Sequence, residues 1–465
     1  MKKKFAIATL GCKVNQFESA SFLSDFRERG CEQVPFSSAA DIYVINTCAV
    51  TARAGQQSRQ LIRRAMRNNP GARIVVTGCY AQMAAEEIVE IVDNPVTIVG
   101  NGNKDLLVEE ALGDSCCELS MLMGNIGHKK EICDLPVQRF SGRTRAFLRI
   151  QDGCNNFCSY CIVPYTRGRS RSLPAKAVFR QVEVFARQGY RELVITGINV
   201  GKYGLDLDGE MDIYTLLDTL CAEHPEMRIR LSSIEPTEIN DRLLAVMTGR
   251  ANFMPHLHIP LQSGDDRILA HMNRRYTVEV FVEAIRKVTA VLPMAAIGCD
   301  VLAGFPGEDE QAAENTRQLL ARLPVTYLHV FPYSKRPGTP AATFTGQVAP
   351  AEKEERVRRL RELDEKKRQE FYDRQAGRVL QVLVERRHRQ SGRMQGFSEN
   401  YVPIRFRGPR RLAGSVVPVR LDRVEDGVPL GTLVDAIASP PGAAATPHER
   451  PRTGQEKNRA RDHAT

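Results

Sequence analysis

The sequence lacks an apolar run that approaches the roughly 18 residues of a membrane span. Its positively charged start, MKKKFAIATLGCKVNQ, has an apolar stretch that ends after Leu10, which is too short for a secretory signal. A Walker phosphate loop and internal repeats are also missing. We therefore expect a cytoplasmic protein without a membrane partner, whose cysteines are reduced thiols or metal ligands and not disulfides.

The 465 residues exceed what one hydrophobic core usually serves, so several domains are expected. Hydrophobic residues make up 42% and charged residues 26%, which is ordinary for a globular protein. Lys and Arg number 65 against 55 Asp and Glu, giving a net charge of +10. This balance favours a polyanionic partner such as nucleic acid.

Short apolar runs alternate with helical periodicity near the N-terminus, which predicts a small doubly wound α/β domain over residues 1–140. The expected parallel strands are 5–11, 41–47, 73–78 and 96–100. Cys12, Cys48 and Cys79 each follow a different strand. Because the carboxyl ends of parallel strands lie along one edge of a sheet, we expect these three thiols to converge there.

A second alternating series predicts an α/β domain over residues 141–375. Its six expected strands are 145–151, 192–199, 228–235, 256–263, 295–304 and 326–334. Six βα units suit an open or partial (β/α)6 barrel better than a complete eightfold one. Catalytic groups are then expected at the carboxyl ends of these strands.

The stretch DGCNNFCSYC places Cys154, Cys158 and Cys161 in a CxxxCxxC triplet with no fourth cysteine close by. Structural zinc sites normally use four protein ligands. A four-iron cluster held by three thiolates leaves one iron free for a small molecule, and the triplet favours this arrangement. A zinc site, or no metal at all, remains as an alternative.

The C-terminal part begins with a charged stretch over 351–376 that reads as a solvated connecting helix. Alternating apolar residues over 376–438 predict a small β-barrel, and residues 439–465 are expected to be disordered. Phe397, Tyr401 and many arginines of this region are typical of a nucleic-acid surface. These arginines are Arg378, Arg386, Arg387, Arg389, Arg393, Arg405, Arg407, Arg410 and Arg411.

The CxxxCxxC loop after the first barrel strand resembles the signature of radical S-adenosylmethionine (SAM) enzymes. The segments VITGIN, SSIEP, PLQSG and DVLAGFPGE resemble that family's strand ends around SAM. The resemblance implies that Cys154, Cys158 and Cys161 carry a 4Fe-4S cluster whose open iron binds SAM and cleaves it to a radical. It also implies a SAM pocket formed by Gly197, Asn199, Ser233, Glu235, Gln262 and Asp300.

Over residues 3–435 the order of parts resembles the methylthiotransferase branch of that family. The resemblance implies a second 4Fe-4S cluster on Cys12, Cys48 and Cys79 and an RNA-binding C-terminal TRAM barrel. TLGCKVNQFES looks like the MtaB type, which adds a methylthio group to C2 of N6-threonylcarbamoyladenosine at position 37, beside the tRNA anticodon. The implied partners are the anticodon stem-loop and an electron donor such as flavodoxin or ferredoxin.

Three other functions compete with this interpretation: methylthiolation of isopentenyladenosine in tRNA, methylthiolation of a ribosomal-protein aspartate, and zinc-stabilised RNA binding without catalysis. Arg167, Arg169 and Arg171 are expected to contact substrate or the SAM carboxylate, unless they form a solvated basic loop. His256 and His258 are expected to pack or to hydrogen-bond, and metal ligation is the alternative. The sequence indicates no role for Cys31, Cys116, Cys117, Cys133, Cys221 or Cys299.

Overall fold

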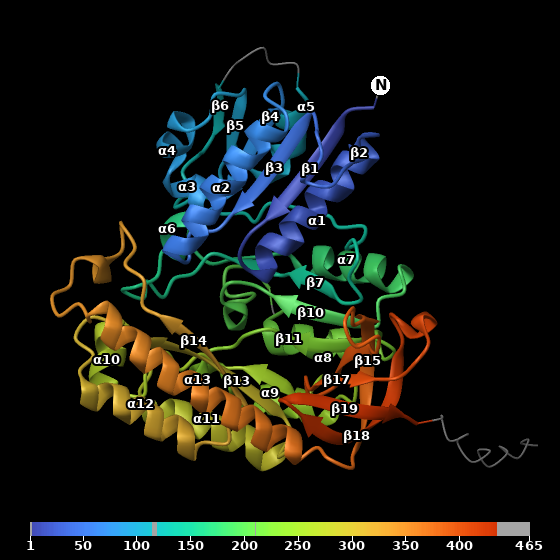
Figure 1. Cartoon of the computed structure of the whole chain (residues 1–465), viewed down its shortest axis with the longest axis vertical. Helices are drawn as coiled ribbons and strands as arrows, with labels where there is room; N and C mark the ends of the chain where they lie inside the picture. Colours follow the sequence, from blue (N-terminus) through green and yellow to red (C-terminus); the bar gives the residue numbers. More distant parts are fainter. Residues whose placement is uncertain (1, 114–118, 210, 435–465) are drawn as a thin grey trace, which may run out of the picture.

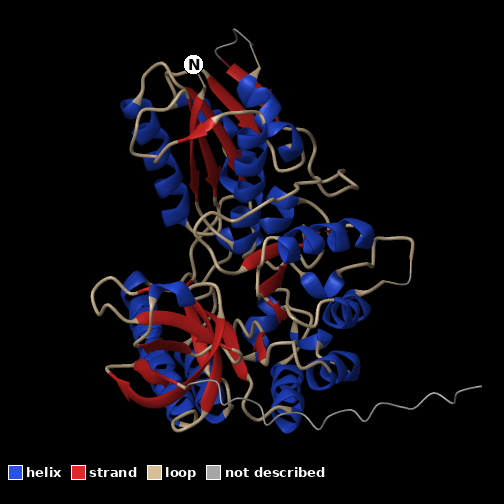
Figure 2. Cartoon of the chain, turned by 90° about the vertical axis from the view of Figure 1, so that its right-hand side faces the viewer, coloured by secondary structure: helices blue, strands red, loops and turns tan. Residues whose placement is uncertain are grey.

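The computed structural model describes residues 2–113, 119–209 and 211–434. An N-terminal α/β domain stands above a central group of parallel strands and helices, and a small β-barrel lies beside that group at the bottom (Figure 1). In the view turned by 90°, the C-terminal barrel and the central helices flank each other below the N-terminal sheet (Figure 2). Cys116, Cys117 and the predicted tail over 439–465 lie outside the described residues.

The N-terminal sheet has six parallel strands in the order β2-β1-β3-β4-β5-β6. They are β1 (Lys4–Thr9), β2 (Glu32–Gln33), β3 (Ile42–Thr47), β4 (Arg73–Gly78), β5 (Val96–Val99) and β6 (Leu119–Leu122). The runs IYVINT and VTIV are buried along their whole length, as expected of strands covered on both faces. The four predicted strands are confirmed. The edge strands β2 and β6 were not predicted.

The chain passes from one side of this sheet to the other between β1 and β3, which are neighbours although β2 comes between them in sequence. Ligand sites in open α/β sheets form at such a switch point, outside the carboxyl ends of the strands. The connecting helices are α1 (Lys13–Glu28), α2 (Ala52–Asn68), α3 (Cys79–Met83), α4 (Ala85–Glu90) and α5 (Leu107–Leu112). Helix α1 begins at the switch point and packs on the first strand of the central domain (Figure 1).

The central domain has six strands in two three-stranded parallel sheets, ordered β7-β10-β11 and β12-β13-β14. A single parallel bridge between Ile229 and Phe253 lies where the sheets meet. The strands are β7 (Ala146–Arg149), β10 (Glu192–Thr196), β11 (Arg228–Leu231), β12 (His256–His258), β13 (Ala296–Ala303) and β14 (Tyr327–Pro332). All six predicted strands are present, which confirms the partial barrel.

Helices cover the outside of this barrel because their apolar stripes face the strands. They are α7 (Ala175–Arg187), α8 (Ile213–Glu223), α9 (Asp241–Gly249), α10 (Asp266–His271), α11 (Val278–Val291) and α12 (Glu310–Arg322). One apolar core contains Phe22 of the N-terminal domain together with Val137 and Phe185. The N-terminal domain and the barrel therefore share a core.

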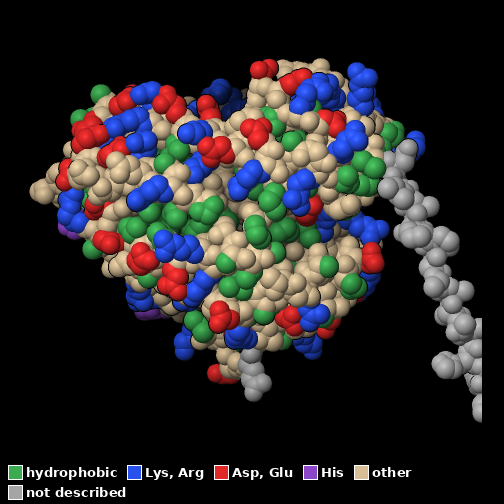
Figure 3. All heavy atoms as spheres, turned by 90° about the horizontal axis from the view of Figure 1, so that it is seen from below, with side chains coloured by type: hydrophobic (Ala, Val, Ile, Leu, Met, Phe, Trp, Pro, Cys, Tyr) green, Lys and Arg blue, Asp and Glu red, His purple; other side chains and the backbone are tan. Residues whose placement is uncertain are grey.

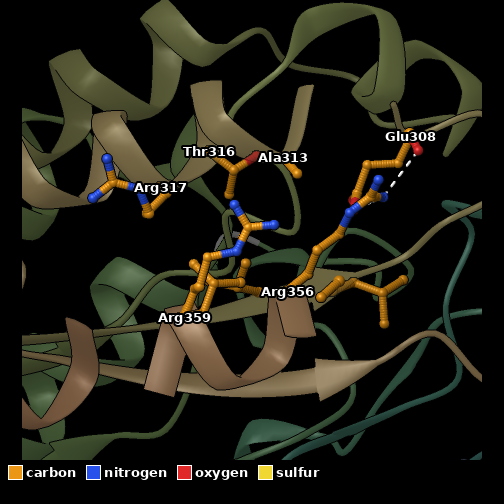
Figure 4. A pocket seen from close by; sticks show the side chains of 10 residues that line it. Glu308, Ala313, Thr316, Arg317, Arg356 and Arg359 are labelled. Carbon is orange, nitrogen blue, oxygen red and sulfur yellow. Dashed lines mark hydrogen bonds and ion pairs between the residues drawn. The ribbon is translucent and has the colours of Figure 1, made fainter. Parts of the chain in front are cut away.

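Helix α13 (Pro350–Asp373) was expected to be a solvated connection, and this expectation is wrong for one of its faces. Val357 and Leu360 are buried there, and Arg356 pairs with Glu308 at 2.8 Å (Figure 4). The cavity at this ion pair encloses only about 20 Å³, which leaves room for little more than a water molecule. Helix α13 thus belongs to the wall of the barrel.

The C-terminal strands close into a five-stranded barrel in the order β15-β16-β17-β19-β18, as predicted. They are β15 (Val379–Arg387), β16 (Met394–Ser398), β17 (Pro403–Phe406), β18 (Val416–Glu425) and β19 (Val428–Leu433). The barrel interior is apolar. In the view from below, Lys and Arg side chains are interspersed with acidic ones, without one continuous basic patch on that face (Figure 3).

Phe397 and Tyr401 do not form the open nucleic-acid surface that was expected of them. Their rings stack with centroids 4.7 Å apart, and the guanidinium of Arg145 lies over both. Tyr401 also stacks on His256 of the central barrel. These aromatic rings therefore dock the C-terminal barrel onto the central domain.

Candidate functional site

The CxxxCxxC loop connects β8 (Gln151–Asp152) with α6 (Val163–Arg167). Cys158 is buried, whereas Cys154 and Cys161 are half-buried. Burial, and after it the neighbouring Cys158, raises the pKa of Cys161 to about 12. Cys154 and Cys161 both lie close enough to Cys158 to be affected by its charge. The structure thus brings the three thiols together.

The backbone of this loop is held in an uncommon conformation. Phe157 has a φ of 48°, and Asn273, which follows α10 and contacts the loop, has a φ of 57°; both lie in the left-handed region that non-glycine residues rarely adopt. The Asn273 amide donates hydrogen bonds to the carbonyls of Asn156 at 3.3 Å and Phe157 at 2.9 Å. Local strain that the surroundings support in this way is typical of functional sites.

The three N-terminal cysteines also lie together, at the carboxyl edge of their sheet. Cys12 precedes α1, Cys48 follows β3, and Cys79 begins α3 after β4. At Gly11, a side chain would place its Cβ 2.9 Å from the Cys48 sulfur, so the loop before Cys12 passes directly over Cys48. Burial, and after it the charge of Cys79, raises the pKa of Cys48 to about 11. The predicted convergence at the sheet edge is confirmed as geometry.

A cavity of about 270 Å³ lies beside Cys161 of the CxxxCxxC loop. Its wall includes Cys161, Gln262 and Asp300 from the central domain. Val50 and Thr51, which follow Cys48 closely, line it from the N-terminal domain. The cavity therefore borders Cys161 on the central domain and, on the N-terminal domain, the segment that follows Cys48.

The remaining predicted SAM-pocket residues are distributed around the cysteine loop. Glu235 lines a smaller cavity of about 70 Å³ together with Cys158, and the Asn199 amide reaches the Cys154 sulfur at 3.9 Å. Gly197 packs so tightly on Gln151 that a Cβ would lie 2.9 Å from its backbone oxygen. Ser233 is exposed and lines neither of these two cavities.

Two histidine side chains contact the carboxylate of Asp300. His258 Nε2 lies 2.9 Å and His329 Nδ1 3.4 Å from its Oδ1. Burial alone would raise the pKa of Asp300, but hydrogen bonds from the two histidines outweigh it and hold the pKa well below its usual range. His258, Asp300 and His329 have the spacing of a cation site, yet direct hydrogen bonds already occupy the carboxylate. The hydrogen-bonding role expected of His258 is present.

His256 also takes the expected role, because its Nε2 lies 2.8 Å from the Tyr327 hydroxyl. Burial, together with the nearby cations Arg230 and Lys13, lowers the pKa of His256 well below its usual value, so the ring is neutral. The stacked His256 and Tyr327 form part of the barrel packing.

Arg167 and Arg171 are buried and line none of the cavities described above, so the solvated basic loop is wrong for them. Helix α6 directs Arg167 into the domain interface, where it pairs with Asp152 at 2.9 Å and Glu18 at 3.0 Å. Arg171 donates to the backbone oxygen of Arg167 at 2.5 Å. Arg169 alone is exposed, with its guanidinium 4.7 Å from the Phe157 ring centroid.

Two arginines at the site were missed by sequence reasoning. Arg274 donates to the Cys158 sulfur at 3.3 Å and forms an ion pair with Glu235. Arg336 donates to the backbone oxygen of Val50 through Nε at 2.9 Å and Nη2 at 2.5 Å. Arg336 lies in the FPYSKRPGTPAA segment. For Arg274 we find no local signal, because its partners are distant in sequence.

Both cysteine groups fit an iron–sulfur cluster chemically. Each offers three thiols, the usual ligands of such clusters, and each has an arginine nearby to balance thiolate charge. Cys133, Cys221 and Cys299 are buried elsewhere, and Cys31 is half-buried. No helix of the described ranges is both long and apolar enough to cross a membrane.

Comparisons with known proteins agree with this arrangement. Residues 4–100 match the family described as "Uncharacterized protein family UPF0004", and residues 148–320 match the radical SAM superfamily. The chain is 39% identical to the threonylcarbamoyladenosine tRNA methylthiotransferase MtaB of Aquifex aeolicus, over 90% of this chain and 99% of that protein. It is 35% identical to the tRNA-2-methylthio-N(6)-dimethylallyladenosine synthase of Pelotomaculum thermopropionicum, over 90% of this chain and 94% of that one.

Among solved structures, the chain is similar in fold to the radical SAM methyltransferase TsrM of Kitasatospora setae. That structure contains cobalamin and a 4Fe-4S cluster. The TM-score is 0.53 at 14% identity, and the match covers 74% of this chain and 77% of the other. At this identity the likeness concerns the fold alone.

Proposed function

This chain belongs to the radical SAM tRNA methylthiotransferase family, and on that premise we propose that it adds a methylthio group to C2 of N6-threonylcarbamoyladenosine at position 37 of tRNA. The observation that carries the proposal is the cavity of about 270 Å³ bordered by Cys161 on one side and by Val50 and Thr51, close to Cys48, on the other. A base in that space would lie against Cys161 and against the segment that follows Cys48.

The unactivated C2–H bond is beyond the reach of a side-chain base, so a cofactor must supply the radical. When bound, SAM and a 4Fe-4S cluster at Cys154, Cys158 and Cys161 supply that radical, and a second cluster at Cys12, Cys48 and Cys79 supplies the sulfur site. The protein's own task is to hold these groups and the base in register.

Several side chains are placed for that task. Arg274 and Glu235 flank the Cys158 sulfur and would fix charged ends of SAM beside it. Phe331 is 45% exposed on the wall of the larger cavity, where its ring offers a stacking surface for a splayed-out base. Gln262 and Asp300 supply polar groups on the same wall.

The C-terminal barrel presents the arginines expected to hold the RNA backbone. Seven of them are exposed: Arg378, Arg386, Arg387, Arg389, Arg407, Arg410 and Arg411. Contacts of this kind bind phosphate without reading sequence. We therefore assign to this barrel the affinity for the anticodon stem-loop, and to the cavity the choice of base.

The isopentenyl (dimethylallyl) nucleoside is the second candidate substrate, since one relative of 35% identity is named for it. The decisive experiment is mass spectrometry of tRNA nucleosides from cells that lack the gene. We expect loss of the methylthio-threonylcarbamoyl nucleoside with the methylthio-isopentenyl one retained, and the loss to be reversed by the wild-type gene. The opposite pattern would assign the isopentenyl substrate.

Metal analysis of anaerobically purified protein tests the two-cluster part separately. Two four-iron clusters predict about eight irons per chain with matching sulfide. A colourless protein that contains only zinc would contradict the proposal. We propose flavodoxin or ferredoxin as the electron donor, and reduction assays with each purified protein would test that choice.

A further inference from the structure

A cluster of buried charges joins the N-terminal domain to the central domain. Glu18 on α1 and Asp152 on β8 face Lys104, Arg149 and Arg167, and each of the five side chains is at most 3% exposed. Lys104 Nζ lies 2.5 Å from Glu18, and Arg149 lies 3.6 Å from Glu18 and 3.7 Å from Asp152. Charges buried this deeply are stable only when they are paired.

Arg167 differs from Lys104 and Arg149 because it also binds Asn15, in the first turn of α1 after Cys12. Its Nη2 donates to the Asn15 side-chain oxygen at 2.6 Å, while Nη1 pairs with Asp152 and Glu18. Arg167 lies at the end of α6, directly after the cysteine loop of the central domain. A single side chain thus extends from one cysteine loop to the other domain.

Asn15 also hydrogen-bonds the backbone beside two of the N-terminal cysteines. Its Nδ2 donates to the backbone oxygen of Leu10 at 2.8 Å and of Thr47 at 2.9 Å. Leu10 leads into Cys12, and Thr47 immediately precedes Cys48. Both carbonyls are therefore held by the amide whose oxygen Arg167 binds.

The charges of the cluster do not balance among themselves, because three cationic side chains meet two carboxylates. Arg167 lies close enough to Cys12 and Cys48 to act on both thiols electrostatically. An iron–sulfur group with three thiolate ligands is anionic and would balance the excess positive charge.

We propose that Arg167 is a positioning residue for the N-terminal cysteine site: it fixes the Cys12 and Cys48 loops against the central domain and supplies the buried positive charge that an anionic group there requires. This inference rests on the proposed second cluster. It goes further by assigning the geometry and reduction potential of that cluster to a residue of the other domain.

The test uses the full chain with Cys154, Cys158 and Cys161 all replaced by Ala, so that bound iron reports the N-terminal site alone. Into this parent we introduce Arg167→Gln, Arg167→Lys and, as matched control, Arg149→Gln. Arg149 belongs to the same buried cluster but does not bind Asn15. Thermal unfolding of the apoproteins reports the loss of stability common to the variants.

We measure the midpoint potential of the cluster by redox titration followed by electron paramagnetic resonance, and iron retention during incubation with a chelator. Arg167→Gln should shift the potential lower, because a nearby positive charge favours the reduced, more negative cluster, and iron loss should be several-fold faster. Arg167→Lys should restore most of the potential but not the retention, since one ammonium cannot bind Asn15 and both carboxylates together. Arg149→Gln removes a charge from the same cluster without releasing Asn15, so it should shift the potential less than Arg167→Gln and leave iron retention near that of the parent.

Equal shifts in the Arg167→Gln and Arg149→Gln proteins, or no shift in either, would overturn the inference and reduce Arg167 to a general interface residue. If Arg167→Gln does not fold, a parent-like retention in Arg167→Lys overturns it equally. A parent that takes up no iron would contradict the second cluster itself, and with it the inference. Failure of the inference alone is recognised by iron in the parent without an Arg167-specific effect.

Discussion

The ring of Tyr401 stacks on the imidazole of His256 with centroids 4.4 Å apart and planes inclined by 30°. Tyr401 belongs to the C-terminal barrel, and His256 begins the fourth strand of the central one. Arg230 covers the same tyrosine ring at 5.0 Å while pairing with Glu192 at 2.8 Å. The C-terminal barrel therefore contacts the central domain through stacked rings flanked by charged side chains.

Replacing Tyr401 with Ala should weaken the contact between the C-terminal barrel and the central domain. Loss of a packed aromatic ring predicts a destabilisation of about 2–3 kcal/mol. Urea unfolding checks the value, and limited proteolysis between α13 and β15 checks that the barrel is released. Leu205→Ala, at a side chain 74% exposed, is the control and should change stability by less than about 0.5 kcal/mol. Equal effects of the two changes would contradict a role of Tyr401 in that contact.

Cys158→Ala and Cys48→Ala should separate the two cysteine groups. We expect Cys158→Ala to abolish all SAM cleavage, and Cys48→Ala to retain cleavage to 5′-deoxyadenosine but to form no methylthio product. Chromatography of 5′-deoxyadenosine and mass spectrometry of the tRNA provide the two readouts. Cys221→Ala, in the distant helix α8, should retain both activities. Product formation by Cys48→Ala would remove the N-terminal group from sulfur transfer.

Arg336→Gln should release the segment after Cys48 from the central domain. Hydrogen bonds from a charged donor contribute about 1.5–3 kcal/mol, so amide exchange nearby should accelerate at least about tenfold. The informative amides are those of Ala54 and Gly55, which bond to the Thr51 carbonyl at 2.9 and 3.2 Å. Lys335→Gln, at the exposed neighbour, is the control. Unchanged amide exchange in Arg336→Gln would show that the segment after Cys48 is stable without the Arg336 hydrogen bonds.

In the apoprotein, the Cys161 thiol should lose its proton only at high pH. The pKa of Cys161 is raised to about 12 by burial and by Cys158, so its alkylation by iodoacetamide should rise about tenfold per pH unit from pH 7 to pH 10. In urea the same thiol should level off near its free pKa of about 8.5. Since iron must displace these protons, cluster assembly should become more favourable as pH rises. An alkylation rate that levels off below pH 9 in the folded protein would contradict the raised pKa.

Sequence patterns predicted the strands well where burial determines them. The runs at β3, β4 and β13 are nearly continuous apolar stretches, and such stretches read as buried parallel strands whatever their neighbours are. Strand β2 escaped notice because it consists of Glu32 and Gln33, which are exposed at the edge of the sheet and carry no apolar signal.

The convergence of the cysteines was also predictable, because strand ends share an edge in a parallel sheet. The partners of the buried arginines could not be predicted from the sequence. Arg167 binds Glu18, which is 149 residues away, and Arg336 binds Val50, which is 286 residues away. A buried ion pair of this kind leaves no local periodicity, so a basic loop and an interface arginine look the same in the sequence.

The buried charge cluster limits how the two halves of the molecule can be exchanged. Grafting this N-terminal sheet onto another barrel would leave Glu18 paired with Lys104 alone, without Arg149 and Arg167 of this chain's central domain. A functional chimaera must therefore carry both sides of that cluster across the junction. The N-terminal and central domains can therefore be transferred to another protein, or change in sequence at this interface, only together.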